Sequence, residues 1–250
     1  MKTFTASPVC VPEEPPEAAA PFFAGLGFSQ IEIFSTWTGC RYDLAEEPSA
    51  FRDRFLKHGL NIVSFHLPQV EADKPETLEN AFAYAKAART MGASLLLYKA
   101  KTIDDYTRTL RLVKPRIDAI GADLLLQNHA HAALSTIEDY EQVIADSGVE
   151  DIRIVLEVGH FVKVGVPWEK ALERFRDRIG LVHIKDMRDG ESVEYGTGTV
   201  DFPALFERLD AIGYTGTYVV EQEGGAEERK RLTPRAVEYL KRLAGEGEAL

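Results

Sequence analysis

The chain has 250 residues, of which 45% are hydrophobic and 28% are charged, and its formal net charge is −11. This is the composition of a globular protein long enough to build a large core. The acidic balance argues against nucleic acids and anionic membranes as partners. Cys10 and Cys40 form neither a CxxC motif nor a disulfide framework, so we expect a reducing cytoplasm. The sequence starts without the apolar core of a signal peptide, and no apolar run reaches the roughly 20 residues that span a bilayer.

Short apolar segments rich in β-branched residues alternate along the chain with amphipathic segments. The sequence predicts eight strands over residues 2–7, 30–34, 61–67, 94–99, 124–129, 152–160, 181–186 and 217–223. It predicts eight helices over residues 13–26, 48–58, 75–91, 104–120, 136–147, 167–178, 201–212 and 227–243. We expect Pro21 and Pro115 to interrupt their helices and Pro234 to bend the last one. Thr136 and Asp201 are candidate N-caps.

Strict alternation of strands and helices predicts an α/β fold, in which right-handed crossovers join parallel strands. Eight such units can close into a (β/α)₈ TIM barrel, and about 250 residues is the usual size of one. No linker, low-complexity segment or composition shift divides the chain. We therefore expect a single barrel domain over residues 1–250.

Polar side chains stand at the ends of the predicted strands, where a TIM barrel collects its catalytic residues. They are Glu32, His66, Lys99, Gln127, Asn128, His129, Glu157, His160, His183, Lys185 and Glu221. Burying carboxylates and imidazoles without partners costs several kcal/mol each, and a divalent cation can supply the compensating charge. Glu157, His183 and Glu221, with Gln127 as a fourth ligand, offer only oxygen and nitrogen. This donor set suits manganese, our first choice, with magnesium, cobalt and zinc as alternatives.

The chain resembles the xylose-isomerase-like TIM barrels, which include ketose 3-epimerases, hydroxypyruvate isomerases, inosose dehydratases and zinc apurinic endonucleases. The resemblance covers nearly the whole chain and rests on GLGFSQIEIF, LLLQNHAH, IVLEVGH, LVHIKD and YGTGTVDFPALFERLDAIGYTGTYVVEQE. It implies one metal held by four strands, at the positions of Gln127, Glu157, His183 and Glu221. Where the family usually has Glu and Asp at the first two positions, this chain has Gln127 and Glu157.

The leading hypothesis is a metal-dependent isomerase or epimerase that acts on a small sugar or keto-sugar through an enediolate. Glu221 is the expected base, and Glu157 is a catalytic residue chiefly as a ligand. The resemblance implies two glutamates that pass a proton on two faces of the sugar, and of these only Glu221 remains. The predicted substrate-binding residues are Trp37, His66, Lys99, His129, His160, Lys185 and Arg188.

Other interpretations stay open at this point. A lyase that dehydrates a keto-sugar or inosose is the runner-up, because Gln127 replaces a carboxylate and a His-x-His run, His129 and His131, follows. A zinc endonuclease is disfavoured by the net charge of −11 and by missing ligands. A barrel that has lost its metal and only binds a ligand is the non-enzyme alternative. Gln127 could lie behind the ligands, and Lys185 could pair with Glu157 or Asp186. A homo-oligomer is compatible with the sequence.

Overall fold

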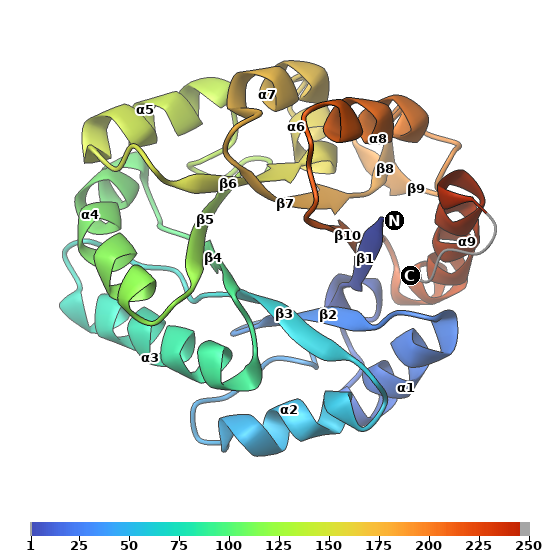
Figure 1. Cartoon of the computed structure of the whole chain (residues 1–250), viewed down its shortest axis with the longest axis horizontal. Coiled ribbons are helices and arrows are strands. Elements are labelled where there is room, and N and C mark those ends of the chain that lie inside the picture. Colours follow the sequence, from blue (N-terminus) through green and yellow to red (C-terminus); the bar gives the residue numbers. More distant parts are fainter. Residues whose placement is uncertain (1, 246–250) are drawn as a thin grey trace.

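An eight-stranded parallel barrel forms the centre of the structure, a computed structural model that describes residues 2–245 (Figure 1). Around the barrel the strands follow the closed order β1-β10-β7-β6-β5-β4-β3-β2. Their bounds are β1 Thr3–Ala6, β2 Gln30–Phe34, β3 Asn61–His66, β4 Leu95–Tyr98, β5 Asp123–Gln127, β6 Arg153–Glu157, β7 Ile179–Ile184 and β10 Thr217–Val220. The predicted TIM barrel is confirmed.

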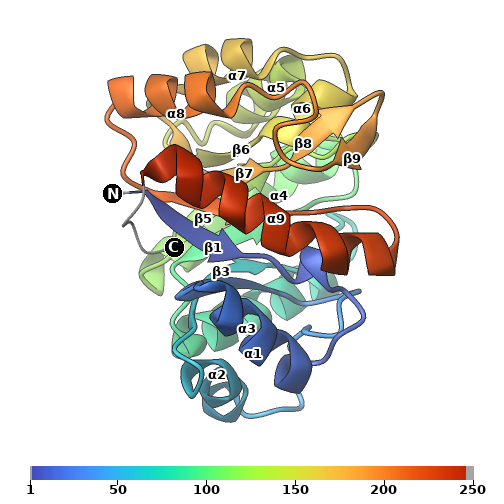
Figure 2. The ribbon, with the colours of Figure 1, turned by 90° about the vertical axis from the view of Figure 1, so that its right-hand side faces the viewer.

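Helices surround the barrel as an outer ring, and the side view shows α9 lying across β1 (Figure 1, Figure 2). They are α1 Pro16–Leu26, α2 Pro48–Leu56, α3 Pro75–Met91, α4 Ile103–Ala119, α5 Ile137–Ser147, α6 Val158–Lys163, α7 Trp168–Phe175, α8 Phe202–Ala211 and α9 Ala226–Ala244, with a short 3₁₀ helix η1 at Pro8–Cys10. The predicted caps are present: Thr136 forms a capping box with Asp139, and the Asp201 carboxylate accepts from the Ala204 amide. Contrary to expectation, α1 and α4 continue through Pro21 and Pro115.

The sixth strand is shorter than predicted. It ends at Glu157, and the residues that follow it, including Gly159 and His160, form the short helix α6. Valine and phenylalanine in this segment are typical of a continuing strand. The chain instead leaves the barrel wall after Glu157 and forms α6, which packs against β7 and β8 (Asp186–Arg188). A Cβ at position 159 would overlap the side chain of Lys185.

The sequence analysis missed a hairpin between the seventh and eighth barrel strands. β8 (Asp186–Arg188) pairs antiparallel with β9 (Glu191–Val193). The turn between them is Asp189–Gly190, and both residues have positive φ, 53° and 80°. An Asp-Gly pair with two positive φ angles is the strongest short-range hairpin signal, so the sequence did carry the information.

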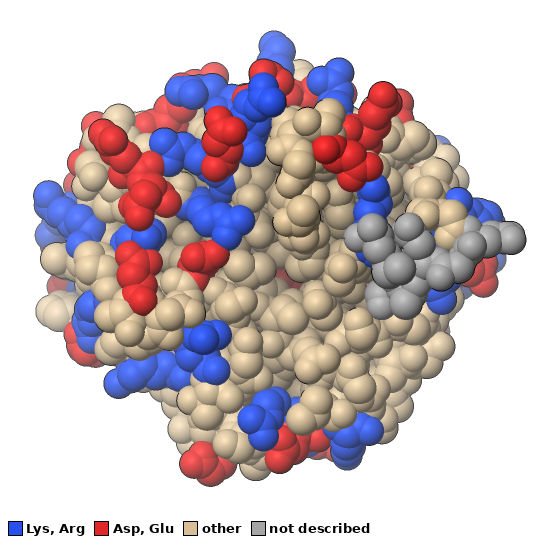
Figure 3. All heavy atoms as spheres, in the orientation of Figure 1, with Lys and Arg blue, Asp and Glu red and all other residues tan. Residues whose placement is uncertain are grey.

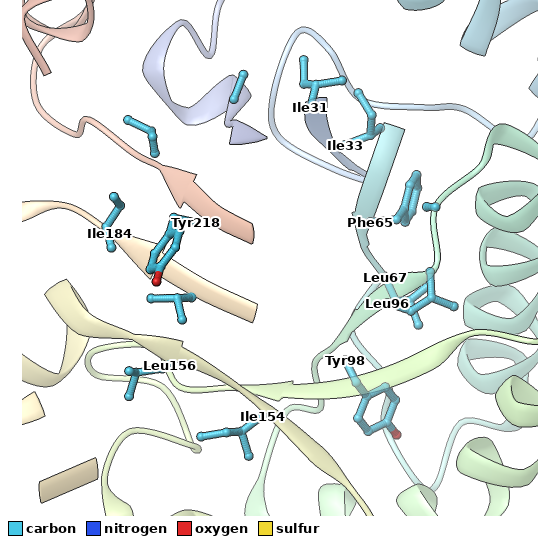
Figure 4. Close-up of a cluster of buried hydrophobic side chains, with 14 of the residues drawn as sticks. Ile31, Ile33, Phe65, Leu67, Leu96, Tyr98, Ile154, Leu156, Ile184 and Tyr218 are labelled. Carbon is cyan, nitrogen blue, oxygen red and sulfur yellow. The ribbon is translucent and has the colours of Figure 1, made fainter. Parts of the chain in front are cut away.

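The strands are buried on both faces, and the two faces differ. The outer faces carry large apolar side chains that pack against the helices, among them Ile33, Phe65, Leu96, Ile154 and Tyr218 (Figure 4). The inner faces carry a separate apolar plug, which consists of Leu97, Leu125, Val155, Leu181 and Val219. Because side chains alternate along a strand, residues two positions beyond the plug also point inward, toward the mouth where the strands end.

On the opposite face, where the strands begin, acidic and basic side chains lie interleaved around the periphery (Figure 3). Many of them pair between neighbouring helices or strands, as Arg116 does with Glu79 and Arg153 with Asp123. Exposed pairs of this kind contribute little to stability. Within residues 2–245, no helix combines the length and apolar character needed to cross a membrane.

Leu125→Ala tests the plug on which the mouth rests. Leu125 is fully buried, so we expect the substitution to lower the free energy of unfolding by about 2–5 kcal/mol, because it leaves a cavity between strands. Leu112→Ala is the matched control, since Leu112 is 56% exposed, and it should change stability by less than about 0.5 kcal/mol. Denaturant unfolding of both variants measures the difference, and equal effects would contradict a packed barrel interior.

Candidate active site

A layer of polar side chains lies directly above the apolar plug. Each member stands two residues beyond a plug residue on the same strand: Lys99, Gln127, Glu157, His183 and Glu221. The parallel register between β6 and β7 sets Glu157 beside His183. The period of two that fills the barrel with leucine and valine therefore also brings five polar groups from five strands to one level.

His183 lies at the centre of this layer and has no exposed surface. Its Nδ1 is 3.0 Å from Glu157 Oε2 and 3.4 Å from Glu221 Oε1, and its Nε2 is 3.4 Å from Glu32 Oε2. Burial lowers the pKa of an imidazole, but the surrounding carboxylates outweigh it and raise the pKa of His183 to about 10. The His183 ring therefore contacts three carboxylates, those of Glu32, Glu157 and Glu221.

Lys185 follows His183 by two residues and is fully buried. Its Nζ lies 2.6 Å from Glu221 Oε2, 2.6 Å from Glu223 Oε1 and 3.5 Å from Glu157 Oε1. Burial opposes the charge, but the three carboxylates hold the pKa of Lys185 well above its usual range. In turn, Lys185 and His183 hold the pKa of Glu221 well below its usual range despite burial. Lys185 does not line the cavity, and its direct contact with substrate stays a prediction.

The pairing of Lys185 with Asp186, which the sequence left open, does not form. Asp186 instead accepts backbone N–H groups from the loop after the hairpin: Gly196 at 2.9 Å, Gly198 at 2.8 Å and Val200 at 3.2 Å. A Cβ at position 198 would overlap the Asp186 carboxylate, which explains the glycine. Asp186 of the HIKD segment therefore anchors the GTGTVDF segment to the end of the seventh barrel strand.

Glu32 supports the opposite side of the layer. Its carboxylate accepts from Ser7 Oγ at 2.5 Å and contacts His66 Nε2 at 2.9 Å. The His66 ring stacks on Phe34 at a centroid distance of 3.8 Å. Burial lowers the pKa of His66 to about 4 although Glu32 acts in the other direction, so the ring is neutral near pH 7. Its Nδ1 has no partner among the described residues.

A cavity of about 330 Å³ opens above the layer at the mouth of the barrel. Six predicted residues of different strands and loops line it, together with the expected base: Trp37, His66, Lys99, Gln127, His129, His160 and Glu221. Glu157 and His183 lie beneath it, fully buried. Arg188 does not line it, and its guanidinium donates to the Thr197 carbonyl in the loop after the hairpin at 3.0 Å. The substrate contact of Arg188 stays a prediction.

Three further charged residues line the cavity and were not predicted: Lys163, Glu223 and Arg229. Glu223 could have been found, because it repeats the charge of Glu221 at an interval of two residues. Arg229 lies in the first turn of α9, and its guanidinium donates to the carbonyls of Gly224 and Val9. Lys163 and Arg229 project from helices, where no strand-end pattern marks them.

Two histidines form one wall of the cavity, with ring centroids 4.0 Å apart. His129 Nδ1 lies 3.0 Å from the Ala130 carbonyl, so it carries the proton and leaves Nε2 as an acceptor. His160 Nε2 lies 3.5 Å from Lys185 Nζ. Burial lowers the pKa of both rings, and the charge of Lys185 adds to the effect at His160. Both imidazoles are neutral near pH 7.

The donor atoms around His183 suit a divalent cation. Glu157, His183 and Glu221 present ligand atoms that all lie within 4.8 Å of one another. Separations of 3.0 and 3.4 Å match those between neighbouring ligands of an ion with bonds of roughly 2.0–2.2 Å. Both His183 nitrogens and Gln127 Oε1 are buried and have no hydrogen-bond partner within residues 2–245. These residues therefore fit the metal that the sequence predicted.

A second group of potential ligands, Glu32, His66 and His183, shares the same imidazole. One neutral imidazole offers a lone pair on only one nitrogen. If Nδ1 binds the cation, Nε2 carries the proton and donates to Glu32, as metal-bound histidines usually do to a carboxylate behind them. An ion bound to Nδ1 would lie between Glu157 and Glu221, and Glu32 would accept the Nε2 proton on the other side of the ring.

The chain is similar to known proteins in sequence and in fold. The family pattern described as Xylose isomerase-like TIM barrel matches residues 22–243. The chain belongs to this family. An inosose dehydratase of Geobacillus thermodenitrificans is 27% identical over 122 residues, 41% of each chain. The 3-dehydro-D-guloside 4-epimerase of Escherichia coli K12 is 30% identical over 128 residues, 51% of this chain and 48% of the relative. These matches thus span about half the length of the curated relatives.

Solved structures of this family share the fold over nearly the whole chain. The IOLI protein with a bound zinc atom has a TM-score of 0.78 at 17% identity, covering 98% of this chain and 96% of the other. L-ribulose 3-epimerase has a TM-score of 0.74 at 19% identity, with 97% and 94% covered. A Mycobacterium smegmatis barrel in complex with magnesium has a TM-score of 0.75 at 16% identity, with 97% and 96% covered.

The depressed pKa of His66 predicts how stability depends on pH. The unfolded chain binds this proton more readily, so stability present above pH 6.5 is lost as the pH falls toward 4. The free energy of unfolding should fall by up to about 1.4 kcal/mol per pH unit from this group. His66→Gln keeps an N–H donor for Glu32 and should reduce the slope. Equal slopes in the wild type and this variant would refute the assignment.

Proposed function

We propose that the protein is a divalent-metal-dependent isomerase or epimerase that moves a proton at a carbon beside the carbonyl group of a keto-sugar. The observation that carries the proposal is the double engagement of Glu221. One carboxylate oxygen faces His183 and the other binds Lys185, while the residue lines the cavity. A carboxylate in this position can contact both a cation and a small substrate. The 3-dehydro-D-guloside 4-epimerase among the relatives supports the same class of reaction.

Glu157, His183 and Glu221 would hold the ion, with the Gln127 amide oxygen as a fourth ligand, and manganese remains our first choice. When bound, the ion would draw electron density from the substrate carbonyl and acidify the neighbouring C–H bond. Glu221 would take the proton. Lys185 fixes the orientation of the Glu221 carboxylate and keeps it ionised. Because the lowered pKa also makes Glu221 a weaker base, the reaction depends on an acidified C–H bond.

The remaining cavity residues would hold the sugar. Neutral His66, His129 and His160 offer nitrogen donors or acceptors for hydroxyl groups. Trp37 lies at the lip of the cavity, 56% exposed, with its ring edge-on to Phe34 at 5.5 Å. An exposed indole at a cavity lip can stack on the apolar face of a sugar ring. A small neutral or weakly charged polyol fits this lining.

The second candidate is a lyase that eliminates water from a keto-sugar or inosose. Gln127 replaces a carboxylate, and the free Nε2 of His129 could exchange a proton with a leaving hydroxyl once it is protonated. The inosose dehydratase relatives make this chemistry plausible for the same barrel. An assay on L-ribulose, an inosose and a 3-dehydro-D-guloside separates the candidates, because isomers form reversibly whereas elimination releases water and shifts the ultraviolet spectrum.

Glu221→Gln should abolish turnover, with a loss of at least about a hundredfold, because the amide cannot accept the proton. Glu223→Gln is the matched control: it alters the other close partner of Lys185 at the same cavity and should retain most activity. Initial rates on the three probes with added manganese measure both. If the Glu221 variant stays within about tenfold of the wild type, roughly 1.4 kcal/mol of barrier, another group is the base.

The metal-free protein should bind one manganese ion per chain, measured by calorimetry after chelation and dialysis. His183→Gln should remove this binding. Gln127→Glu adds a negative charge to the ligand set, so it should tighten the binding. His131→Gln serves as control, since His131 lines the cavity but not the layer of ligands. Unchanged affinity in the His183 variant would exclude the assigned site.

A further inference from the structure

Lys99 enters the cavity from the wall that faces Glu221. It follows β4, and Glu221 follows β10; β4 is the fourth strand from β10 in either direction around the closed barrel (Figure 1). Lys99 stands two residues beyond Leu97, as Glu221 stands two residues beyond Val219. Both residues belong to the inward-facing layer, and both line the cavity. A substrate between them would present one face to each.

No described residue pairs with the Lys99 side chain through a hydrogen bond or an ion pair. This sets it apart from Lys185, which takes three carboxylates. Lys99 is half-buried. A partly desolvated amine without a partner is costly unless it binds a ligand or loses its charge. Burial lowers the pKa of Lys99, and Lys185 adds to this, whereas the more distant carboxylates of Glu221, Glu32 and Glu157 oppose it. The neutral rings of His66 and His129 also line this cavity.

Next to Lys99, the strand β5 ends in Gln127, which cannot serve as an acid or base. Gln127 ends β5, next to β4, at the same level of the barrel. An amide can ligate a cation or donate a hydrogen bond, but it cannot accept or release a proton near neutral pH. Glu221 on the far wall reaches one face of the substrate. Inversion at carbon needs a second acid–base group on the other face.

We propose that Lys99 is this second acid–base group, acting on the sugar face opposite Glu221. The inference rests on the function proposed above. In one direction Glu221 takes the proton from carbon, and the C–H electron pair moves toward the carbonyl oxygen. The Lys99 ammonium then gives a proton to the same carbon from the other face, and the carbonyl re-forms. Glu221 is left protonated and Lys99 neutral, and exchange with solvent resets both. The reverse reaction uses the neutral amine as base.

A lysine suits this role better than a permanently charged group. Its amine can exist in both forms when the pKa is brought down toward the working pH, whereas an arginine stays charged. Two structural rivals remain for Lys99: a fixed cation that balances the acidic layer, and a hydrogen-bond donor that only holds the substrate. Both rivals require the charge or the contact, and neither requires a proton transferred to carbon.

Exchange in D₂O distinguishes these roles. The manganese-loaded protein is incubated with L-ribulose, an inosose or a 3-dehydro-D-guloside, and with the epimer that it produces from each. Lys99→Met and Lys99→Arg should slow epimerisation by at least about a hundredfold, yet still exchange the C–H proton that faces Glu221. Glu221→Gln should show the mirror image and exchange the proton only from the other epimer. This pattern requires two bases on two faces.

Three results would overturn the inference. Epimerisation by Lys99→Arg within about tenfold of the wild type would make Lys99 a fixed cation. Both Lys99 variants could lose exchange from both epimers, which makes it a binding residue. If every probe underwent elimination and no epimer formed, no proton would be delivered to the carbon face opposite Glu221, and Lys99 could not have the proposed role.

A wild type that exchanges no probe would instead count against the proposed function, and a direct titration then decides Lys99. After reductive ¹³C-methylation, the NMR signal assigned by its loss in Lys99→Arg should titrate below that of the exposed Lys57. A signal that titrates with Lys57 or above it would contradict the inference without any reference to activity.

Discussion

The Lys185 ammonium, closed off from solvent between Glu221, Glu223 and Glu157, is the interaction on which the mouth of the barrel depends. Three carboxylates and an imidazole could not share a water-poor layer without a cation among them. Lys185 supplies this charge without lining the cavity. It also demands space: Gly159 is a glycine because a Cβ there would overlap the Lys185 chain. Gly159 of the EVGH segment thus leaves the space that the Lys185 side chain of the HIKD segment occupies.

Loops beyond the strands hold this arrangement in place. Asp186 draws the loop over residues 194–200 back onto the barrel through backbone N–H groups. Tyr195 from the same loop donates to the carbonyls of Ile184 and Glu221. The strand ends that carry His183 and Glu221 are therefore tied together from outside as well as through their side chains. A rigid support of this kind favours a site whose groups must meet a small substrate within fractions of an ångström.

The sequence predicts the fold because its main signals are local. Alternating apolar segments of strand and helix length leave few architectures, and the polar strand ends mark the inner layer with a period of two. Gln127, Glu157, His183 and Glu221 do converge, although their roles stay proposals. The sequence did not show how far a long side chain reaches or in which direction it points. Lys185 stands at a strand end, but its ammonium group binds the carboxylates of Glu221 and Glu223 and does not line the cavity.

The positions of three other charged residues also depend on contacts that the sequence pattern does not show. Arg188 follows a strand in the sequence, yet the unpredicted hairpin carries it away from the cavity. Lys163 and Arg229 reach the cavity from helices, which no strand pattern anticipates. Contacts between segments distant in sequence decide these positions, as between Arg229 and the carbonyl of Val9.

Anomalous diffraction from crystals soaked in manganese tests the central claim most directly. The account predicts a single strong peak at the mouth, roughly 2.0–2.4 Å from Glu157 Oε2, His183 Nδ1 and Glu221 Oε1, with Lys185 still bound to the other Glu221 oxygen. A peak beside His183 Nε2, between Glu32 and His66, or a Lys185 side chain displaced from Glu221 by the ion, would contradict it.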